Sequence, residues 1–380
     1  MNTMSELKFL DLAAQQNLIR ENIEQRIKAI LEHNHYIMGP EVAELEDELA
    51  KFCGAKHVIS CANGTDAIEL VLMAKDVQPN HAIFVPSFTF AATAEVVRLA
   101  GAQPVFIDVL PDTFNIDPES LVRGIKFAKE NNLIPTGIIA VDIFGQPADY
   151  DKLEQIAKEY GIWVVCDSAQ SFGGVYNGKK VGSIGLATTT SFFPAKPLGC
   201  YGDGGCVFTN DDQLSDVLRS IKSHGQGHHR YENVRVGMNS RLDTIQAGIL
   251  LEKLKLFPEE LRKRQAVADL YDSRLRDIVV TPRIIPEAKS AWAVYTILLR
   301  NGQDRDAIQE KLKAAGIPTM IYYPKPLHLQ KAYSDCLKAD TSLPTSELLS
   351  SKVLSLPIHP YLDFSEGHLD KLVEILSFAK

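Results

Sequence analysis

The sequence has little cysteine, and its cysteines are not arranged in the closely spaced pairs that hold structural zinc. The 380 residues include six cysteines, which are scattered along the chain. Scattered cysteines are typical of free thiols in a reducing compartment, which predicts a cytoplasmic protein. We therefore expect neither a disulfide framework nor a metal site.

Long apolar runs and an excess of positive charge are also missing. No apolar stretch approaches the roughly 20 residues that a membrane-spanning helix needs. Residues 1–8 lack the apolar region of a signal peptide. The formal net charge of −8 provides no basic surface of the kind that binds nucleic acid. These absences argue against a membrane protein, a secreted protein and a nucleic-acid-binding protein.

The composition is that of a soluble globular protein, and the length suggests about two domains. Short apolar runs alternate with helical patterns, which predicts an α/β fold with a mostly parallel seven-stranded sheet and helices on both faces. We place this large domain at residues 1–256, with a long helix near 242–255 leading out of it. Residues 257–380 are expected to form a smaller α+β domain with a strand near 293–300. The seven predicted strands are 57–60, 82–85, 103–108, 138–142, 163–167, 188–192 and 205–210.

Lys196 stands in an unusual setting, between an apolar run and several glycines, in the segment 191–205 (SFFPAKPLGCYGDGG). Its small and apolar neighbours predict that the ammonium is partly desolvated. Desolvation lowers the pKa of a lysine, and a neutral amine can attack a carbonyl. The alternative is an ordinary lysine on a surface loop.

Asp167 follows the apolar run 162–166, which has the composition of a buried strand. Ligands of parallel α/β sheets bind beyond the carboxyl ends of the strands. A carboxylate there can hold a proton on a ring nitrogen, as a pyridoxal phosphate (PLP) site requires. The alternative is that Asp167 caps the next helix.

A third segment, residues 59–70, runs from a predicted strand through Asn63, Gly64 and Thr65 into a helical pattern. Free backbone N–H groups at a helix N-terminus suit a phosphate. The order of strand, turn and helix is common in α/β proteins, so this segment gains weight only together with Lys196 and Asp167.

Together with further motifs, these segments resemble the sugar aminotransferases of the DegT/DnrJ/EryC1/StrS family, which are PLP enzymes of the aspartate-aminotransferase fold (fold type I). The resemblance covers nearly the whole chain. The motifs that carry it are 9–12 (FLDL), 39–46 (GPEVAELE), 60–67 (SCANGTDA), 86–93 (PSFTFAAT), 167–171 (DSAQS), 191–205, 237–243 (GMNSRLD) and 322–328 (YYPKPLH).

The resemblance implies a role for individual residues around the cofactor. Lys196 carries PLP as a Schiff base and acts as general acid and base, while Asp167 pairs with the pyridine nitrogen. Gln170 reaches the phenolic oxygen, and Phe90 covers the ring, although Phe90 is also compatible with a core position in a strand. The implied phosphate-binding residues are Gly64, Thr65, Ser191 and, from the second subunit of a homodimer with shared sites, Asn239.

The resemblance also implies the substrates, namely glutamate as amino donor (leaving as 2-oxoglutarate) and a UDP-linked keto sugar as acceptor. Arg241, Tyr322 and Tyr323 lie where relatives contact the sugar nucleotide. The motifs are most similar to a branch that aminates C3 of UDP-2-acetamido-2-deoxy-3-keto-D-glucuronic acid for bacterial surface polysaccharides such as O-antigen. Arg241 could pair with the uronate carboxylate.

Three alternatives compete with this interpretation. Tyr322 replaces a histidine of the branch pattern, which leaves a 4-aminotransferase acting on a UDP-linked 4-keto-6-deoxy-N-acetylhexosamine open. Relatives that deoxygenate sugars carry histidine in place of Lys196, so the lysine argues against that class. A non-catalytic PLP-binding regulatory protein is the third alternative.

Overall fold

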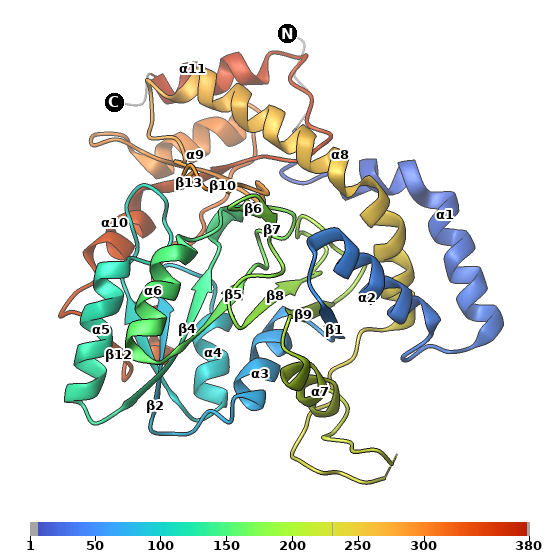
Figure 1. The fold of residues 1–380 in the computed structure, drawn as a ribbon. Coiled ribbons are helices and arrows are strands. Elements are labelled where there is room, and N and C mark those ends of the chain that lie inside the picture. Colours follow the sequence, from blue (N-terminus) through green and yellow to red (C-terminus); the bar gives the residue numbers. More distant parts are fainter. Residues whose placement is uncertain (1–6, 230, 378–380) are drawn as a thin grey trace.

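The protein is built on one large mixed sheet, seen in the computed structural model, which describes residues 7–229 and 231–377 (Figure 1). Only β9 runs antiparallel to its neighbours, and the other adjacent pairs in the sheet are parallel. In spatial order the strands are β1 (His57–Cys61), β9 (Gly205–Thr209), β8 (Ala187–Ser191), β5 (Trp163–Asp167), β4 (Ile134–Val141), β2 (His81–Pro86), β3 (Gln103–Ile107) and β12 (Leu337–Lys338).

The seven predicted strands are all present in this sheet, and the short strand β12 extends it at the β3 edge. Most of their sequences are apolar runs because both faces of the sheet are covered, whereas β8 carries three buried threonines. Along β2, Phe84 packs with α5 and α6 on one face, while Ile83 and Val85 pack with α3 and α4 on the other. The helices are α5 (Pro118–Glu130), α6 (Tyr150–Tyr160), α3 (Gly64–Ala74), α4 (Ala92–Leu99) and α7 (Asp212–Ile221).

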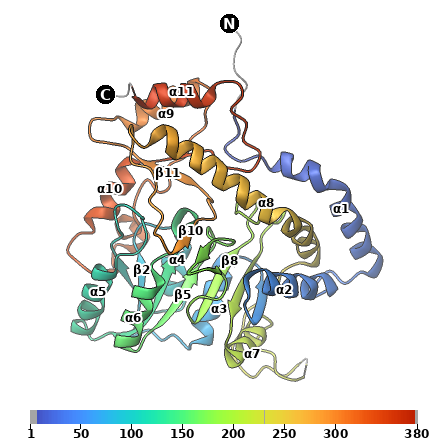
Figure 2. The same cartoon turned by 45° about the horizontal axis from the view of Figure 1, so that its top comes forward.

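Three further helices pack together beside the β1 end of the sheet, namely α1 (Leu12–His33), α2 (Pro40–Cys53) and α8 (Thr244–Leu275) (Figures 1 and 2). α8 has 32 residues and continues well beyond the predicted helix end near residue 255. It contains Pro258, which removes one backbone hydrogen bond but leaves the helix continuous. The buried side chains of Phe257 and Arg264 on either side of the proline hold the helix in place.

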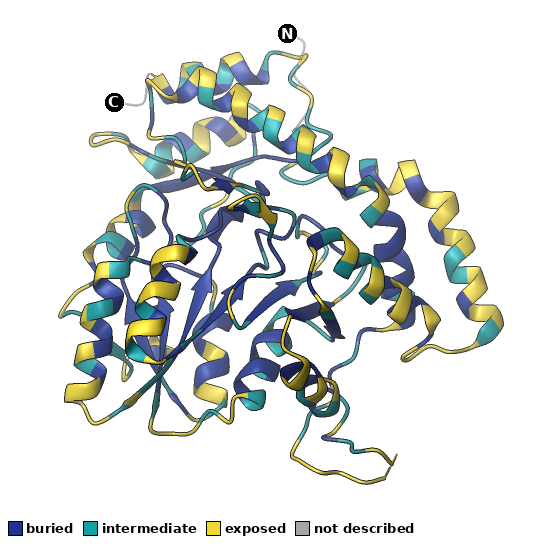
Figure 3. Cartoon of the chain, viewed as in Figure 1, coloured by how far each residue is buried: buried dark blue, intermediate teal, exposed yellow. Residues whose placement is uncertain are grey.

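The C-terminal part of the chain has its own apolar core. The second half of α8 packs there against the antiparallel pair β11 (Tyr295–Leu298) and β13 (Val353–Leu356), together with α9 (Arg305–Ala314) and α11 (His368–Ser377). Figure 3 shows buried residues in both cores. The remaining elements are β6 (Val175–Tyr176), β7 (Lys179–Lys180), β10 (Ala288–Lys289), α10 (Pro344–Lys352) and the 3₁₀ turns η1 (Ile143–Gly145), η2 (Leu327–Leu329) and η3 (Lys331–Tyr333).

The predicted domain boundary between residues 256 and 257 falls inside α8, and β12 returns from beyond it to the large sheet. The division into two domains therefore stays a prediction. Among the described residues, no helix combines the length and apolar character needed to cross a membrane.

Phe172 links the large sheet to α8, and it provides a test of this packing. Its ring stacks on Phe208 of β9 at 5.3 Å and on Phe257 of α8 at 5.9 Å between ring centres, and it is buried. Phe172→Ala should lower the free energy of unfolding by about 3–5 kcal/mol, because it leaves a cavity in the core. Urea denaturation measures this loss. Leu18→Ala, at an exposed position on α1, is the control and should stay within about 0.5 kcal/mol of the wild type.

Candidate active site

Asp167 ends the central strand β5, and its buried carboxylate faces the carboxyl edge of the sheet. The backbone N–H of Ala169 donates to its Oδ1 at 3.0 Å. Residues 168–174, all described, form a turn and no helix, so Asp167 does not act as a helix cap. Its position at the strand end is the one predicted for a ligand-binding carboxylate.

The charges of Asp167 and Lys196 influence each other. Burial raises the pKa of Asp167, and the positive charge of Lys196 partly offsets this rise. Burial lowers the pKa of Lys196, against the opposing effect of Asp167. Both carry a desolvation penalty, so Asp167 is a carboxylate that a further cation would stabilise, and Lys196 is an amine that loses its proton more readily than an exposed lysine.

The N-terminus of α3 and the end of β8 meet at very short range. A Cβ atom on Gly64 would lie 2.6 Å from Cβ of Ser191, and one on Gly205 would lie 2.4 Å from the carbonyl oxygen of Asn63. Glycine is therefore required at both positions for the backbones to approach. Asn63 caps α3 by accepting from the N–H of Asp66 at 2.8 Å. Gly64, Thr65 and Ser191 thus present N–H and hydroxyl groups at one place, as a phosphate site needs.

Gln170 and Tyr323 are hydrogen-bonded to each other near Asp167. The N–H of Phe144 donates to Oε1 of Gln170 at 2.7 Å, and Nε2 of Gln170 donates to the hydroxyl of Tyr323 at 3.2 Å. Nε2 carries two hydrogens, so the amide keeps a second one to donate. Burial raises the pKa of Tyr323. Phe90 is 58 % exposed, with its ring centre 6.5 Å from that of Tyr323, so it is not a core residue.

Asp142, which was not predicted as a site residue, supports the turn that carries Gln170. It follows β4, and its backbone N–H donates to the carbonyl oxygen of Asp167 at 3.0 Å. Its side chain accepts hydrogen bonds from Ser171 at 2.5 Å and from Tyr150 at 2.6 Å. Burial raises the pKa of Asp142 to about 7. The sequence held a signal for it, since it also ends a predicted strand.

Asn239 and Arg241 lie in the segment before α8 and line a separate open hollow of about 440 Å³. Ile37, Gly202 and Gln246 also line it. Ser240, between the two predicted residues, donates to Asp66 Oδ2 at 2.6 Å and accepts from the N–H of Ala62 at 3.1 Å. The segment is therefore fastened to the N-terminal turn of α3, and neither Asp167 nor Lys196 is among the residues that line its hollow.

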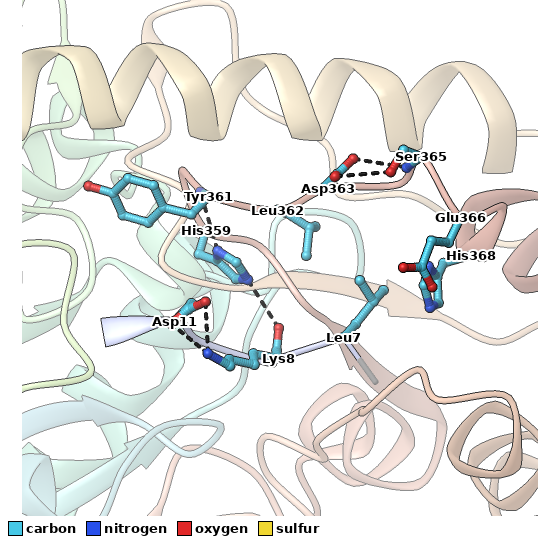
Figure 4. Close-up of a pocket in the computed structure, with 10 residues that line it drawn as sticks. All are labelled: Leu7, Lys8, Asp11, His359, Tyr361, Leu362, Asp363, Ser365, Glu366 and His368. Atoms are coloured by element: carbon cyan, nitrogen blue, oxygen red, sulfur yellow. Dashed lines mark hydrogen bonds and ion pairs between the residues drawn. The ribbon is translucent and has the colours of Figure 1, made fainter. Parts of the chain in front are cut away.

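A further pocket, of about 160 Å³, lies between residues 7–11 and 359–368 (Figure 4). Its polar groups bond largely to one another, as in the pairs Lys8–Asp11 and Asp363–Ser365 and in the bond from His359 Nε2 to the carbonyl of Lys8 at 3.1 Å. The residues lining it include no predicted site residue. In the described part of the chain, no group of three or more His, Cys, Asp or Glu side chains could hold a metal ion.

The site fits PLP in three respects. Gly64, Thr65 and Ser191 form a small recess that suits a phosphate and that a Cβ atom on Gly64 would fill, which we call the phosphate cradle. Beside it are a buried carboxylate that favours a nearby cation and a lysine with a lowered pKa. On this large α/β sheet, such a set of groups is typical of a PLP enzyme of fold type I. The model of the DegT/DnrJ/EryC1/StrS aminotransferase family matches residues 17–377, and the chain belongs to this family.

Individual relatives agree with the family. The chain is 48 % identical to the UDP-2-acetamido-2-deoxy-3-oxo-D-glucuronate aminotransferase of Pseudomonas aeruginosa, over 94 % of this chain and 96 % of that protein. It is 41 % identical to a pleiotropic regulatory protein of Geobacillus stearothermophilus, over 93 % of each chain. The crystal structure of a DegT DnrJ EryC1 StrS aminotransferase from Brucella abortus superposes with a TM-score of 0.94 at 49 % identity, covering 97 % of this chain and 98 % of that one.

Asp167→Asn tests the role of the buried carboxylate. An amide cannot supply the negative charge that holds a proton on a ring nitrogen, and losing one preorganised electrostatic partner costs about 10²–10³ in rate. Transamination rates should fall by this factor, while the visible absorbance of bound cofactor remains. Asp149→Asn, which changes the cap of α6, is the matched control and should keep its activity. A rate for Asp167→Asn within a few-fold of the wild type would remove Asp167 from this role.

Proposed function

We propose that this aminotransferase moves the amino group of glutamate to C3 of UDP-2-acetamido-2-deoxy-3-keto-D-glucuronic acid, a step in making a bacterial surface polysaccharide. The similarity to the Pseudomonas aeruginosa enzyme over nearly the full length of both chains is the main support. Arg241 adds a structural argument. It lines an open hollow, and its neighbour Ser240 donates to Asp66 in the first turn of α3, next to the phosphate cradle. The guanidinium of Arg241 can bind a carboxylate in a bidentate manner.

In this proposal, the residues at the carboxyl edge of the sheet bind and orient the cofactor. The N–H groups at the start of α3 and the hydroxyl of Ser191 hold its phosphate, with Asn239 of a second subunit. Asp167 keeps the proton on the ring nitrogen, and Gln170 donates to the phenolic oxygen. Phe90 covers one face of the ring. PLP, when bound, supplies the electron sink that stabilises negative charge at the reacting carbon.

Lys196 holds the cofactor covalently and then moves protons. Its Nζ takes the proton from the α-carbon of glutamate in the first half-reaction and delivers a proton to C3 of the sugar in the second. An amine must be uncharged to accept a proton, and the lowered pKa of Lys196 increases the uncharged fraction near neutral pH. A regulatory protein that only binds PLP would need this amine to hold the cofactor but not to move protons, so the lowered pKa of Lys196 favours an enzyme over that alternative.

A homodimer with shared sites completes the proposal. Ile37 lines the open hollow that holds Asn239 and Arg241, and about half of Ile37 and of its neighbour Met38 is exposed. Exposed apolar residues grouped beside a polar hollow suit a protein–protein interface. A cytoplasmic location agrees with the six cysteines, which are all free thiols.

The choice of sugar can be tested through Arg241. With glutamate as donor, the wild type should aminate the UDP-linked 3-keto uronic acid in preference to a UDP-linked 4-keto-6-deoxy-N-acetylhexosamine. Arg241→Ala should reduce kcat/KM for the uronic acid by about 10- to 100-fold, because a charged hydrogen bond contributes about 1.5–3 kcal/mol. The 6-deoxy sugar should change by only a few-fold. Arg262→Ala, remote on α8 and paired with Glu259, is the control. Equal losses on both sugars would contradict the uronic-acid proposal.

Subunit mixing tests the shared site. Lys196→Ala and Arg241→Ala proteins should each be inactive or strongly impaired alone on the uronic acid. If Arg241 serves the neighbouring subunit, a mixed dimer has one site with both changes and one with neither. An equal mixture should then regain about one quarter of wild-type activity, since half of the dimers are mixed and each has one intact site. No recovery after confirmed subunit exchange would place Arg241 in the site of its own chain.

A further inference from the structure

The segment that carries Lys196 is a closed loop. Its ends are joined by a hydrogen bond from the N–H of Cys200 to the carbonyl oxygen of Phe192 at 2.8 Å. Within the loop, the N–H of Lys196 donates to the carbonyl oxygen of Phe193 at 2.8 Å. A Cβ atom on Gly199 would lie 2.6 Å from the carbonyl oxygen of Phe193. The chain therefore folds back tightly on itself at Gly199, and a displacement there would be transmitted to Lys196.

Lys253, on α8, contacts this loop through its ammonium group. Its Nζ donates to the carbonyl oxygen of Gly199 at 2.6 Å and lies 4.5 Å from the centre of the Tyr201 ring. The side chain is only 1 % exposed. Burial lowers the pKa of Lys253 to about 8, with the charge of Glu260 acting in the opposite direction. A buried ammonium needs compensating contacts, and here the loop itself supplies two of them.

A second observation brings the two lysines together. Lys196 and Lys253 line the same small cavity, of about 20 Å³, together with Pro194 and Pro197 from the loop. Gln246, two turns earlier on α8, accepts from the N–H of Tyr201 at 2.9 Å. α8 thus contacts this segment at two successive points, Gly199 and Tyr201. The contact made by the charged Lys253 is at Gly199, which is closer in sequence to Lys196.

We propose that Lys253 is a positioning residue for Lys196, and that its ammonium fixes the Gly199 carbonyl so that the loop presents the reactive amine in one orientation. The inference rests on the proposed function of Lys196. A lysine that must both hold the cofactor and move protons needs a defined position, and a displacement of about 1 Å can cost about 10²-fold in rate. Lys253 itself does not touch the reacting atoms in this proposal.

Lys253→Met tests the proposal, because methionine fills the space but cannot donate. The change leaves the Gly199 carbonyl without this donor at a cost of about 1–3 kcal/mol, which is less than the stability of a typical domain, so this variant should fold. We expect kcat to fall by about 10- to 100-fold while KM for glutamate stays within about twofold. The pH at which the visible band of the bound cofactor titrates should also shift. Lys253→Arg, which keeps a charged donor, should recover part of kcat.

A measurement without cofactor separates this proposal from the function of Lys196. In the apo-protein, hydrogen–deuterium exchange of a peptide covering residues 192–204 should be at least several-fold faster in Lys253→Met than in the wild type. Lys255→Met is the matched control, since Lys255 lies on the same helix but is exposed and paired with Glu252. It should leave kcat and the exchange of the loop unchanged.

The outcomes are distinct. A folded Lys253→Met protein with wild-type exchange in the loop and wild-type kcat overturns the positioning role. If that variant does not fold, Lys253→Gln, which is too short to reach the same carbonyl, takes its place with the same criteria. Activity in Lys196→Ala would instead overturn the proposed function, whereas faster loop exchange in the apo-protein would still support the contact between Lys253 and the loop.

Discussion

The close approach of three backbone segments at the carboxyl edge of the sheet is the constraint on which the site depends. Gly64 allows the first turn of α3 to touch Ser191, and Gly205 allows β9 to pass beside Asn63. A side chain at either glycine would separate these segments. The helix N-terminus and the Ser191 hydroxyl would then no longer face the same point. The antiparallel strand β9 between β1 and β8 brings these segments together, so the topology of the sheet and the two glycines act jointly.

The chemistry of the site depends on charges that the fold keeps out of water. Asp142 follows β4 and Asp167 ends the neighbouring strand β5, but they have different surroundings. Asp142 is satisfied by hydroxyl and N–H donors and fastens a turn, whereas Asp167 has one backbone donor and the charge of Lys196. The less satisfied carboxylate is the one suited to hold a cationic ring. Two acidic residues of the same type thus take a structural and a chemical role because of their hydrogen-bond partners.

Much of the fold could be predicted from the sequence, because buried strands leave short runs of apolar and β-branched residues, and all seven predicted strands are present in the sheet. Asp167 and Lys196 stood out for local reasons, namely a strand end and an apolar, glycine-rich setting. The bond between Ser240 and Asp66 joins residues 174 positions apart, and that between Lys253 and Gly199 joins residues 54 apart, so no local pattern contains them. The continuation of α8 past Pro258 was missed because tertiary packing outweighs the lost hydrogen bond. The roles that we propose for Asn239 and Arg241 require a second chain, whose contacts no local pattern in one sequence describes.

The proline in α8 has a mechanical consequence. The 32 residues of the helix span about 48 Å, from the segment beside the phosphate cradle to the C-terminal core. Pro258 offers no hydrogen to the carbonyl of Leu254, so the helix is most easily bent there. Gln246 and Lys253 both lie before the proline. The buried side chains of Phe257 and Arg264 oppose such a bend, so the first half of the helix, which contacts the loop of Lys196, keeps its position relative to the C-terminal core.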